Sequence, residues 1–562
     1  MTVVAHQKWW GWGVDGVTFD HTDKPKLAPF AMQRIGLDLN APRTFKPLLS
    51  DLQVPAPRLD DALAAALRMA VGEDYVKTAD LDRVVHTYGK GFVDLLRIRA
   101  GKLPRVPDVV VYPADEDEVR AVVDAVDRSD AVLIPFGGGS SITGALTPQP
   151  QENRMIISLD LGRMNRVLEI DDAARLARIQ AGALGPDMER QLNAYGCTLG
   201  HQPDSFNHST LGGWIATRSS GMQSDKYGDI AEIVRGLRVV QPHKVVVLRP
   251  LPSTSSGPSV REMIIGSEGR LGVITEAWVN VHEVPSNRKI IAYLFRSWDA
   301  GLAAMRQISL SDARPSVTRL SDADETAFSL STQKGGKRIS AVAQRALFEV
   351  LRSRGWNLDA MCLAFIGFEG GDARVKADKV VVRQILKQHG GFVLGNGPGV
   401  LYDQKKFDTP YIRDFLLDIG AIGDVSETAA PWSKLGQLYT NVRVAAHDAF
   451  DRVGERGFVM CHLSHSYHSG ACLYFTFVMK LGQGSLDEQL IRYWEIKTSI
   501  QQAFIDSGGT LSHHHGVGTD HARWLPEDIS DAGTDMVVAL LRGVDPHRNL
   551  NPGTLLPADR EW

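Results

Sequence analysis

Three consecutive glycines, Gly137 to Gly139, are the feature that most constrains how this chain can fold. They follow the apolar residues Ala131 to Ile134, which we expect to form a short buried strand, and Pro135, which ends the ladder hydrogen bonding of that strand. Without Cβ atoms the loop can turn either way, and three adjacent N–H groups make a concave nest that suits a pyrophosphate. No Gly-Lys-Ser/Thr follows, and the spacing is not that of the Rossmann fingerprint. Alone, such a turn can also be a tight loop without a ligand.

Two later segments have the same character. The second runs from Gly200 to Gly221 and gathers hydroxyl side chains before a helix that we expect to start at Thr210 or Leu211. A helix N-terminus that a ligand can approach closely is a second site for an anion or a ring edge. The third, residues 264–276, is a glycine turn that enters a β-branched strand. Three such loops within about 140 residues predict a cradle for a cofactor.

Composition and charge exclude several classes of function. A chain of 562 residues should hold two or more domains, and a net charge of −4 gives no general basic field, so we expect no nucleic-acid partner. The four cysteines contain no CxxC pair, which indicates a reducing compartment and no disulfide framework. No run approaches 18 apolar residues, and the N-terminus has no signal pattern. These features predict a cytoplasmic protein and leave room for a peripheral contact at the inner membrane face.

The order of predicted elements indicates a mixed α/β (α+β) fold. An irregular stretch and helices at Asp60 to Val71 and within Asp80 to Gly101 precede strands and helices that alternate from Pro107 onwards. After Asn287 the pattern predicts a cap domain with an antiparallel sheet and helices, in which Gly390 to Gly399 is a loop. We therefore divide the chain into an N-terminal arm with helices, a cofactor domain, a substrate cap and a C-terminal helical segment that returns to the cofactor domain, at residues 1–100, 101–285, 286–485 and 486–562.

Two histidine clusters carry the strongest chemical signal. Residues 511–518 place His513, His514 and His515 side by side, and residues 461–468 contain three more histidines. Imidazoles titrate near neutral pH and can move protons or bind metal, although a polar loop is the bland alternative. In the strand that follows, alternate residues put Tyr474 on one face, where it could donate or accept a proton, more readily if a neighbouring histidine lowers its pKa. Core packing is the competing interpretation of this tyrosine.

The three loops together resemble the flavin domain of the vanillyl-alcohol-oxidase/PCMH-type family, which binds FAD between two α/β subdomains. The matching sequences are Pro-Phe-Gly-Gly-Gly-Ser-Ser, Pro-Asp-Ser…Ser-Thr-Leu-Gly-Gly and Gly-Ser-Glu-Gly-Arg-Leu-Gly-Val-Ile-Thr-Glu. No His or Cys lies within the first loop, so we expect non-covalent FAD. The resemblance implies the following FAD-binding residues: Pro135, Phe136, Gly137, Gly138, Gly139, Ser140, Ser141, Asp204, Ser205, Ser209, Thr210, Gly213, Thr217, Ser219, Ser220, Glu268, Gly269, Gly272, Val273 and Ile274.

Nearly the whole chain resembles the alkyldihydroxyacetonephosphate synthase branch of this family. The matching segments are residues 8–13, 200–205, 316–320, 411–414 with 427–432, 470–475 and 512–518. The resemblance implies exchange of the fatty acyl group of acyl-dihydroxyacetone phosphate for a fatty alcohol through a flavin N5 adduct, without net redox. It also implies lipid substrates, a homodimer and no metal.

The same resemblance implies the catalytic roles. Tyr474 is the general acid/base, His514 and His515 are its proton partners, and His513 belongs to the same loop. Arg413 binds the departing carboxylate or else the phosphate, and its guanidinium suits either anion. The resemblance also gives Arg319 and His201 the task of positioning flavin and substrate.

The sequence departs from the synthase pattern at two places, and two alternative functions remain. Residues 519–523 lack the lysine-rich continuation of the eukaryotic synthases, and the chain ends Arg-Glu-Trp without a peroxisomal signal, which indicates a bacterial-type relative. The runner-up is an FAD-linked D-2-hydroxy acid dehydrogenase (D-lactate, glycolate or 2-hydroxyglutarate type), which shares the Asp-Pro…Asn-Pro-Gly pattern at residues 545–553. Its Glu-His-Gly turn is His-His-Gly here, so a carboxylate ligand is missing, although a metal at His462, His465 or His468 stays open. A flavin-binding scaffold without turnover is the second alternative.

Overall fold

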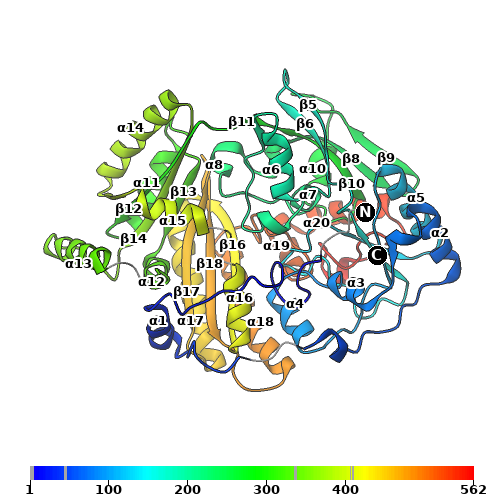
Figure 1. The fold of residues 1–562 in the computed structure, drawn as a ribbon, viewed down its shortest axis with the longest axis horizontal. Coiled ribbons are helices and arrows are strands. Elements are labelled where there is room, and N and C mark those ends of the chain that lie inside the picture. The colour runs from blue at the N-terminus through cyan, green and yellow to red at the C-terminus, as the bar shows by residue number, and fades with distance from the viewer. Residues whose placement is uncertain (1–5, 44–46, 335–337, 406, 408–409) are drawn as a thin grey trace.

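The computed structural model describes residues 6–43, 47–334, 338–405, 407 and 410–562. The first five residues of the predicted arm lie outside this range. Among the described residues, three smaller sheets precede a large one along the chain, as predicted for a mixed α/β fold (Figure 1). Within the described residues, no helix is both long and apolar enough to cross a bilayer.

The glycine-loop part contains a four-stranded and a five-stranded sheet. In the first sheet β2, β4 and β3 run parallel, and β1 is antiparallel to β2; the second sheet is antiparallel throughout. Their strands, in spatial order, are β1 (Val76–Lys77), β2 (Val109–Val111), β4 (Ile156–Asp160) and β3 (Val132–Phe136), then β5 (Val167–Asp171), β6 (Leu176–Gln180), β10 (Val273–Asn280), β8 (Val234–Gln241) and β9 (Lys244–Leu248). A short pair joins β7 (Cys197–Thr198) to β11 (His282–Glu283).

Side chains at the N-termini of two helices in this part accept backbone N–H groups of the first turn. Asp115 accepts the backbone N–H of Glu118 at the start of α5 (Glu116–Arg128), and acidic residues fill the first turn, which suits the positive end of the helix dipole. Thr210 caps α7 (Leu211–Ala216) in the second loop. The other helices here are α6 (Gly185–Asn193), α8 (Ser224–Tyr227), α9 (Ile230–Ile233) and α10 (Val260–Ile264).

A seven-stranded antiparallel sheet forms the second part. Its order is β15 (Phe392–Gly395), β12 (Asn287–Phe295), β14 (Cys362–Gly370), β13 (Val317–Ser321), β17 (Phe458–Ser466), β18 (Gly470–Lys480) and β16 (Ala421–Pro431). Along β18, Leu473, Phe475 and Phe477 are fully buried in a core to which several helices contribute, among them α11 (Trp298–Ser309), α14 (Asp372–Gln388), α17 (Trp432–Val453) and α18 (Leu486–Asp506). Because side chains alternate along a strand, the intervening residues face the other way.

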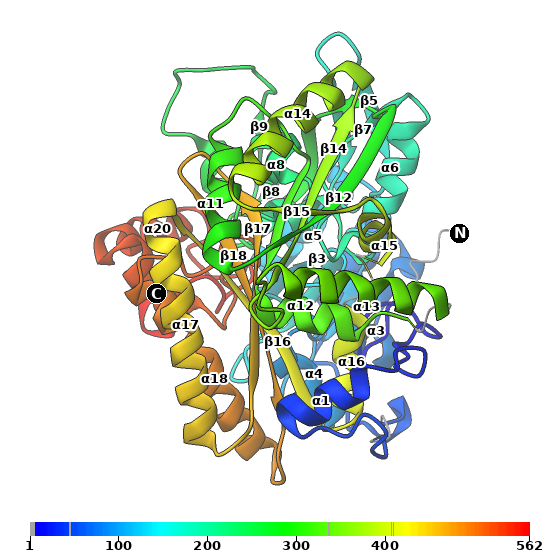
Figure 2. The same ribbon diagram turned by 90° about the vertical axis from the view of Figure 1, so that its left-hand side faces the viewer.

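Figure 2 shows the helices that stand against the two faces of this sheet. The long helices α17 and α18 lie on one side. On the other side, Leu27 and Ile35 of α1 (Leu27–Ile35) share a smaller core with Phe415 of α16 (Pro410–Asp418) and Phe458 of β17. The remaining helices of this part are α12 (Ala323–Ser331), α13 (Arg338–Ser353) and α15 (Gly397–Lys405). The predicted loop at residues 390–399 is therefore wrong, since β15 adds a short edge strand there before α15.

An extended N-terminal arm lies between the two parts before α1. The side chain of Gln7 donates to the carbonyl oxygens of Gly138 (2.6 Å) and His208 (3.2 Å) in the first two glycine loops. The backbone N–H of Trp12 donates to Asp414 on α16 at 2.9 Å. The arm thus connects the first glycine loop to a helix of the second part. After the arm and α1, the chain forms α2 (Asp61–Val71), α3 (Asp80–Val85) and α4 (Phe92–Arg99).

The C-terminal residues complete the first part of the chain. After α19 (Leu525–Ile529) and α20 (Asp531–Val544), the backbone lies along the edge strand β3, where Leu133 and Leu550 form a parallel bridge. The side chain of Asn551 donates to the carbonyl oxygen of Glu268 at 2.7 Å, and buried Arg270 pairs with Glu561. In Figure 1 the red C-terminal segment lies among the blue and cyan elements.

Candidate active site

One large cavity, of about 1700 Å³, lies where the two parts meet. All three glycine loops line it, together with residues from the inner face of the large sheet and from the histidine loop. Of the residues predicted for the site, Val273, His201 and His513 do not line the cavity, and all the others do. The structure therefore brings together segments as far apart in sequence as Pro135 and His515.

The first glycine loop packs more tightly than the sequence suggests. A Cβ at Gly138 would lie 1.9 Å from the carbonyl oxygen of His208, and one at Gly137 would lie 2.3 Å from Oγ1 of Thr210. These glycines are therefore required because the first loop lies directly on the second. Pro135 and Phe136 still pair with β4, so the strand extends two residues further than predicted.

The lining of this end of the cavity fits the diphosphate and polar ring edge of FAD. Hydroxyl side chains predominate there, and Glu268 directs its carboxylate elsewhere, accepting the backbone N–H groups of Val517 (2.6 Å) and Gly518 (2.9 Å). Burial raises the pKa of Glu268 to about 7. The hydroxyl donors are Ser140, Ser141, Ser205, Ser209, Thr210, Thr217, Ser219 and Ser220. Hydroxyl and backbone donors are the groups that bind phosphate without excess positive charge.

A row of polar side chains crosses the inner face of the large sheet. Glu427 on β16 and His462 on β17 are both register partners of Tyr474 on the strand between them, β18. Directly opposed residues in a sheet point to the same side, so the three side chains face the cavity side together. The ring of Tyr474 stacks on His462, with centroids 4.8 Å apart and an angle of 21° between the planes. The predicted orientation of Tyr474 is confirmed, because it lines the cavity.

His462 belongs to a buried charged cluster with Arg319 and Glu325. Oε1 of Glu325 lies 2.7 Å from the Arg319 guanidinium and 3.1 Å from Nδ1 of His462. Burial opposes ionisation, but the charges of His462 and Arg319 lower the pKa of Glu325 to about 2. Arg319 lines the cavity with its charge already paired, which suits positioning of a neighbouring group. Nothing in the sequence pointed to Glu325, which looks like an ordinary acidic residue in the first turn of α12.

Glu427 anchors the histidine loop, and the sequence analysis did not assign it a role. Its buried carboxylate accepts the backbone N–H groups of His513 (2.6 Å), His514 (3.0 Å) and His515 (2.9 Å), and the hydroxyl of Ser512 (2.8 Å). Burial raises the pKa of Glu427, but the charges of His514, His515 and His513 outweigh it and hold this pKa well below its ordinary value. The only signal for Glu427 in the sequence was its place at the start of the matching segment 427–432.

Burial controls the protonation states of Tyr474, His514 and His515. Burial, followed by the charges of Asp204 and Glu427, raises the pKa of Tyr474 well above its ordinary value, so the condition that a neighbouring histidine lowers this pKa is not met. Burial lowers the pKa of His514 to about 3 and that of His515 to about 4. At neutral pH the tyrosine is therefore a proton donor and the two imidazoles are neutral acceptors. The rings of His515 and Tyr474 lie 5.5 Å apart.

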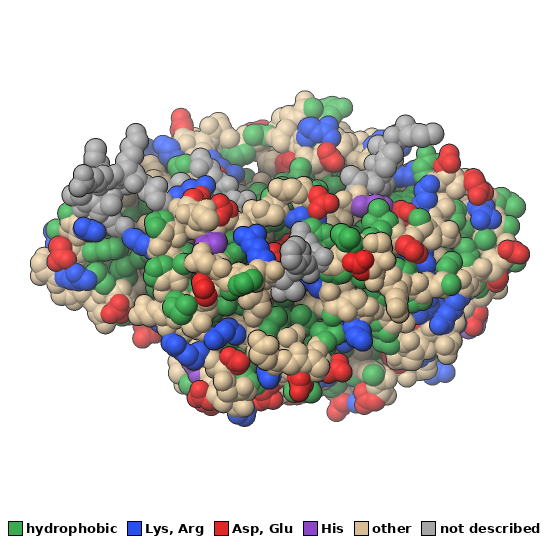
Figure 3. Space-filling view, turned by 60° about the horizontal axis from the view of Figure 1, so that its bottom comes forward, with side chains coloured by type: hydrophobic (Ala, Val, Ile, Leu, Met, Phe, Trp, Pro, Cys, Tyr) green, Lys and Arg blue, Asp and Glu red, His purple; other side chains and the backbone are tan. Residues whose placement is uncertain are grey.

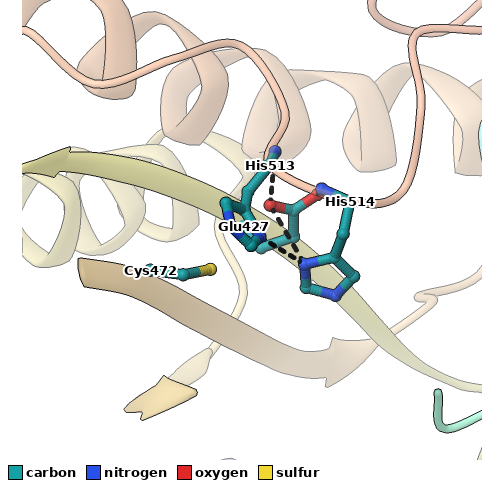
Figure 4. A group of neighbouring side chains, drawn as sticks. All are labelled: Glu427, Cys472, His513 and His514. Atoms are coloured by element: carbon teal, nitrogen blue, oxygen red, sulfur yellow. Dashed lines mark hydrogen bonds and ion pairs between the residues drawn. The ribbon is translucent and has the colours of Figure 1, made fainter. Parts of the chain in front are cut away.

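A group with the composition of a metal site occurs within the described residues. Glu427, Cys472, His513 and His514 each place one ligand atom within 4.8 Å of the others (Figure 4). The carboxylate of Glu427 could replace the one missing from the Glu-His-Gly turn of the hydroxy acid dehydrogenases. None of His462, His465 and His468, at which the sequence left a metal open, belongs to this group. Four N–H and O–H donors already occupy the carboxylate, and the two Nδ1 atoms lie 2.9 Å apart, which is a hydrogen-bond distance. We treat the group as a hydrogen-bonded network, and the absence of a metal stays a prediction.

Of the two predicted residues His201 and Arg413, only Arg413 lines the cavity. His201 is buried behind the cavity wall, where it contacts Trp214 and lies 2.8 Å from the Ser219 hydroxyl; burial lowers its pKa to about 4. It can position Ser219 but does not reach the cavity. Arg413 lines the cavity from α16 and lies over the Trp12 ring, and its buried Nε has no hydrogen-bond acceptor among the described residues.

The other end of the cavity is apolar. It extends from the tyrosine and arginines to side chains of the N-terminal arm, α1, α12, α16 and the ends of β17 and β18. These residues include Phe19, Leu27, Phe30, Leu37, Leu39, Phe328, Phe415, Phe458, Met460 and Val478. The cavity therefore joins a hydroxyl-rich end, a charged centre and an apolar end.

Comparison with known proteins identifies both parts of the chain. The FAD binding domain matches residues 107–247, and the C-terminal domain of FAD-linked oxidases matches residues 284–555. The alkyldihydroxyacetonephosphate synthase of Dictyostelium discoideum is 35% identical, over 99% of this chain and 94% of the relative. The synthase of Trypanosoma brucei brucei is 34% identical, over 90% and 82%. A solved structure of an alkyldihydroxyacetonephosphate synthase superposes with a TM-score of 0.84 at 33% identity, covering 97% of this chain and 98% of the other.

Proposed function

Because this chain belongs to the alkyldihydroxyacetonephosphate synthase family of FAD-linked enzymes, we propose that it exchanges the acyl group of acyl-dihydroxyacetone phosphate for a fatty alcohol, forming an ether lipid. The observation that carries the proposal is the single cavity that joins the FAD loops, the Tyr474 and histidine cluster, and an apolar end of the kind that a fatty chain occupies.

The residues of the cavity suit the chemistry of this exchange. A carboxylate is a poor leaving group from a saturated carbon, and removing the proton next to the ketone lets it leave. The neutral imidazoles of His514 and His515 accept that proton, and Tyr474 donates a hydrogen bond or a proton to the oxygen that gains charge. Arg413 holds the departing carboxylate or the phosphate with charge-assisted hydrogen bonds, and Arg319 orients the neighbouring groups.

The hydroxyl-rich end of the cavity holds FAD. The three glycine loops bind the diphosphate and ring edge through the residues predicted for that role, except Val273, which lies outside the lining. FAD, when bound, supplies a nucleophilic ring nitrogen for the exchange, with no net oxidation or reduction. The protein keeps this chemistry away from water by enclosing it between the two parts of the chain.

The test is anaerobic mixing of the purified flavoprotein with candidate substrates. Bleaching of the flavin absorbance is expected with palmitoyl-dihydroxyacetone phosphate, and recovery of the colour is expected when hexadecanol is added. D-lactate and D-2-hydroxyglutarate serve as the comparison, because a hydroxy acid dehydrogenase would be reduced by one of them. Reduction by a hydroxy acid without any response to the acyl ketone would overturn the proposed reaction.

FAD is expected to be non-covalent, since no His or Cys lies within Gly137 to Ser141. Acid precipitation of the purified protein is expected to release all of the yellow colour into the supernatant. A yellow pellet after washing would contradict this prediction.

Arg413→Ala is expected to raise KM about 30-fold while FAD occupancy stays intact. The guanidinium lines the cavity from α16, outside the glycine loops, so its loss removes a charge-assisted contact with a substrate anion, which costs about 2 kcal/mol. Steady-state kinetics and the flavin-to-protein absorbance ratio measure the two effects. Arg34→Ala, at the apolar end of the same cavity, is the matched control and is expected to leave KM within a few fold. Loss of flavin with normal kinetics in the remaining holoenzyme would show that Arg413 serves the cofactor instead.

Membrane contact, oligomeric state, cellular location and domain boundaries are also proposals. A peripheral membrane contact stays a prediction, because the basic residues at the apolar end of the cavity are paired: Asp23 binds Lys24 and Lys334, and Asp324 binds Arg34. On the face drawn in Figure 3, basic and acidic side chains are interspersed with apolar ones. The homodimer, the cytoplasmic location and the division at residues 100, 285 and 485 stay predictions.

A further inference from the structure

A chain of hydrogen bonds runs from the cavity into the protein behind the histidine loop. Nδ1 of His514, which lines the cavity, lies 2.9 Å from Nδ1 of His513. Nε2 of His513 lies 2.5 Å from the hydroxyl of Tyr467, and this hydroxyl donates to Oδ2 of Asp229 at 2.7 Å. Tyr467 lies in the turn between β17 and β18, and Asp229 precedes α9, so the chain crosses from one part of the protein to the other.

This series of hydrogen bonds determines which atom of each side chain carries a hydrogen. The hydroxyl of Tyr467 gives its single hydrogen to Asp229, so its oxygen accepts a hydrogen bond from Nε2 of His513. A neutral imidazole carries one N–H, which leaves Nδ1 of His513 bare and makes it the acceptor for Nδ1 of His514. Nε2 of His514 is then the nitrogen without a hydrogen.

We propose that Asp229, Tyr467 and His513 are positioning residues that hold His514 in the tautomer whose bare Nε2 takes the proton from the substrate. The step rests on the proposed function: a C–H bond next to the ketone breaks, its electron pair moves to the ketone oxygen as an enolate, and an N–H bond forms at Nε2 of His514. The positive charge is shared with His513, and Asp229 balances it through Tyr467. An aspartate that orients a histidine base works by the same principle in catalytic triads.

The surroundings agree with this assignment. Burial opposes ionisation of Asp229, but the neighbouring His513 and His465 rings and the hydrogen bond from Tyr467 hold its pKa below the ordinary value, so it is a carboxylate at neutral pH. His513 stacks on His465 with centroids 5.4 Å apart, which accounts for its position behind the cavity wall. The other titratable groups that face the His513–His514 pair are Glu427 on β16, His465 and His462 on β17, Cys472 and Tyr474 on β18, and His515 in the loop.

The first test reads the tautomer without substrate. Histidine labelled with ¹⁵N in the holoenzyme gives separate resonances for protonated and bare ring nitrogens, and His514→Gln assigns the residue. The expected result is a hydrogen on Nδ1 and none on Nε2, with this preference lost in Tyr467→Phe. A hydrogen on Nε2 in the wild type overturns the inference, whatever the substrate of the enzyme proves to be.

The second test uses kinetics and separates positioning from folding. Tyr467→Phe is expected to lower kcat about 10- to 100-fold, a part of the 10²–10⁴ that a general base contributes, with KM and FAD content unchanged. Tyr439→Phe is the control. The hydroxyl of Tyr439 also donates to a buried carboxylate, that of Asp322, at 3.1 Å, but it does not belong to the chain of hydrogen bonds that leads to His514. This variant is expected to keep normal kcat, and an equal loss in both variants overturns the inference.

The Asp229→Asn variant tests whether the negative charge of Asp229, and not only its shape, supports the histidine base. Asparagine still caps α9, so the fold is kept, while the negative charge is lost. Without that charge the protonated His513–His514 pair is less stable, and both limits of the kcat/KM pH profile are expected to move to lower pH. Lower activity with an unshifted profile would show a structural role only.

Discussion

Replacing Tyr474 with phenylalanine is expected to lower turnover of acyl-dihydroxyacetone phosphate by about 10²–10⁴-fold, with little change in thermal stability or FAD content. Phenylalanine keeps the ring that stacks on His462 and fills the same space beside the histidine loop. Only the hydroxyl is lost, and the raised pKa of Tyr474 makes that hydroxyl a proton donor at neutral pH. Single-turnover kinetics with the acyl ketone and the fatty alcohol measure the effect.

The neighbouring strand position provides the control. Thr476 lines the same cavity two residues along β18, so Thr476→Val also removes one hydroxyl from this face and is expected to stay within a few fold of the wild type. His515→Ala is expected to cost about as much as Tyr474→Phe, and the double variant little more, because the two act as one unit. Turnover of Tyr474→Phe within about threefold of the wild type would end the claim that this residue is catalytic.

Glu427→Gln is expected to lower both stability and turnover. The carboxylate accepts three backbone N–H groups and one hydroxyl, whereas the amide of glutamine would direct its own N–H₂ towards some of these donors. Each buried donor left without an acceptor costs about 1–3 kcal/mol. Displacement of His514 and His515 by about 1 Å would lower turnover about 100-fold. Thermal unfolding and steady-state kinetics measure the two effects.

The pH dependence distinguishes the charge of Glu427 from its shape. Because its pKa in the folded protein lies well below the ordinary 4.5, the ionised form stabilises the fold fully above about pH 4.5, and this stabilisation is lost as the pH falls through the folded-state pKa. The difference in unfolding free energy between wild type and Glu427→Gln is therefore expected to be largest at neutral pH and to narrow in acid. Thr428→Val removes one hydrogen bond, to Thr510, from the same strand and should show no such narrowing. A constant difference at every pH would contradict the role of the charge.

Local patterns predicted several of the elements and the face on which Tyr474 lies, but not the edge strand β15. The cap at Thr210, the alternation along β18 that turns Tyr474 to the cavity, and the antiparallel sheet all follow from nearest-neighbour rules that a sequence displays. The FAD-binding residues were predicted by resemblance, and only Val273 lies outside the lining, because it is fully buried in β10.

Contacts between distant segments could not be predicted. Glu427 lies 86 positions from His513, and nothing in a strand of small and apolar residues reveals which loop will lie over it. Asp229 looks like an ordinary helix cap until the hairpin places Tyr467 against it. The glycine at position 138 was explained by the ligand, but the obstacle to a side chain there is the carbonyl of His208, 70 residues away. Each of these depends on how the two parts of the chain come together.

The position of the C-terminal residues also sets the timing of folding during synthesis. Strand β3, which leads into the first glycine loop, is an edge strand, and the backbone that covers its edge arrives only at residues 549–551. The ribosome adds about 5–20 residues per second, so the roughly 400 residues between β3 and residues 549–551 take about 20–80 s to be made. For that time the nascent cofactor site has an unpaired strand edge, which is the kind of surface that chaperones protect and that aggregation exploits. The ribosome must therefore release almost the entire chain before its earliest ligand site is complete.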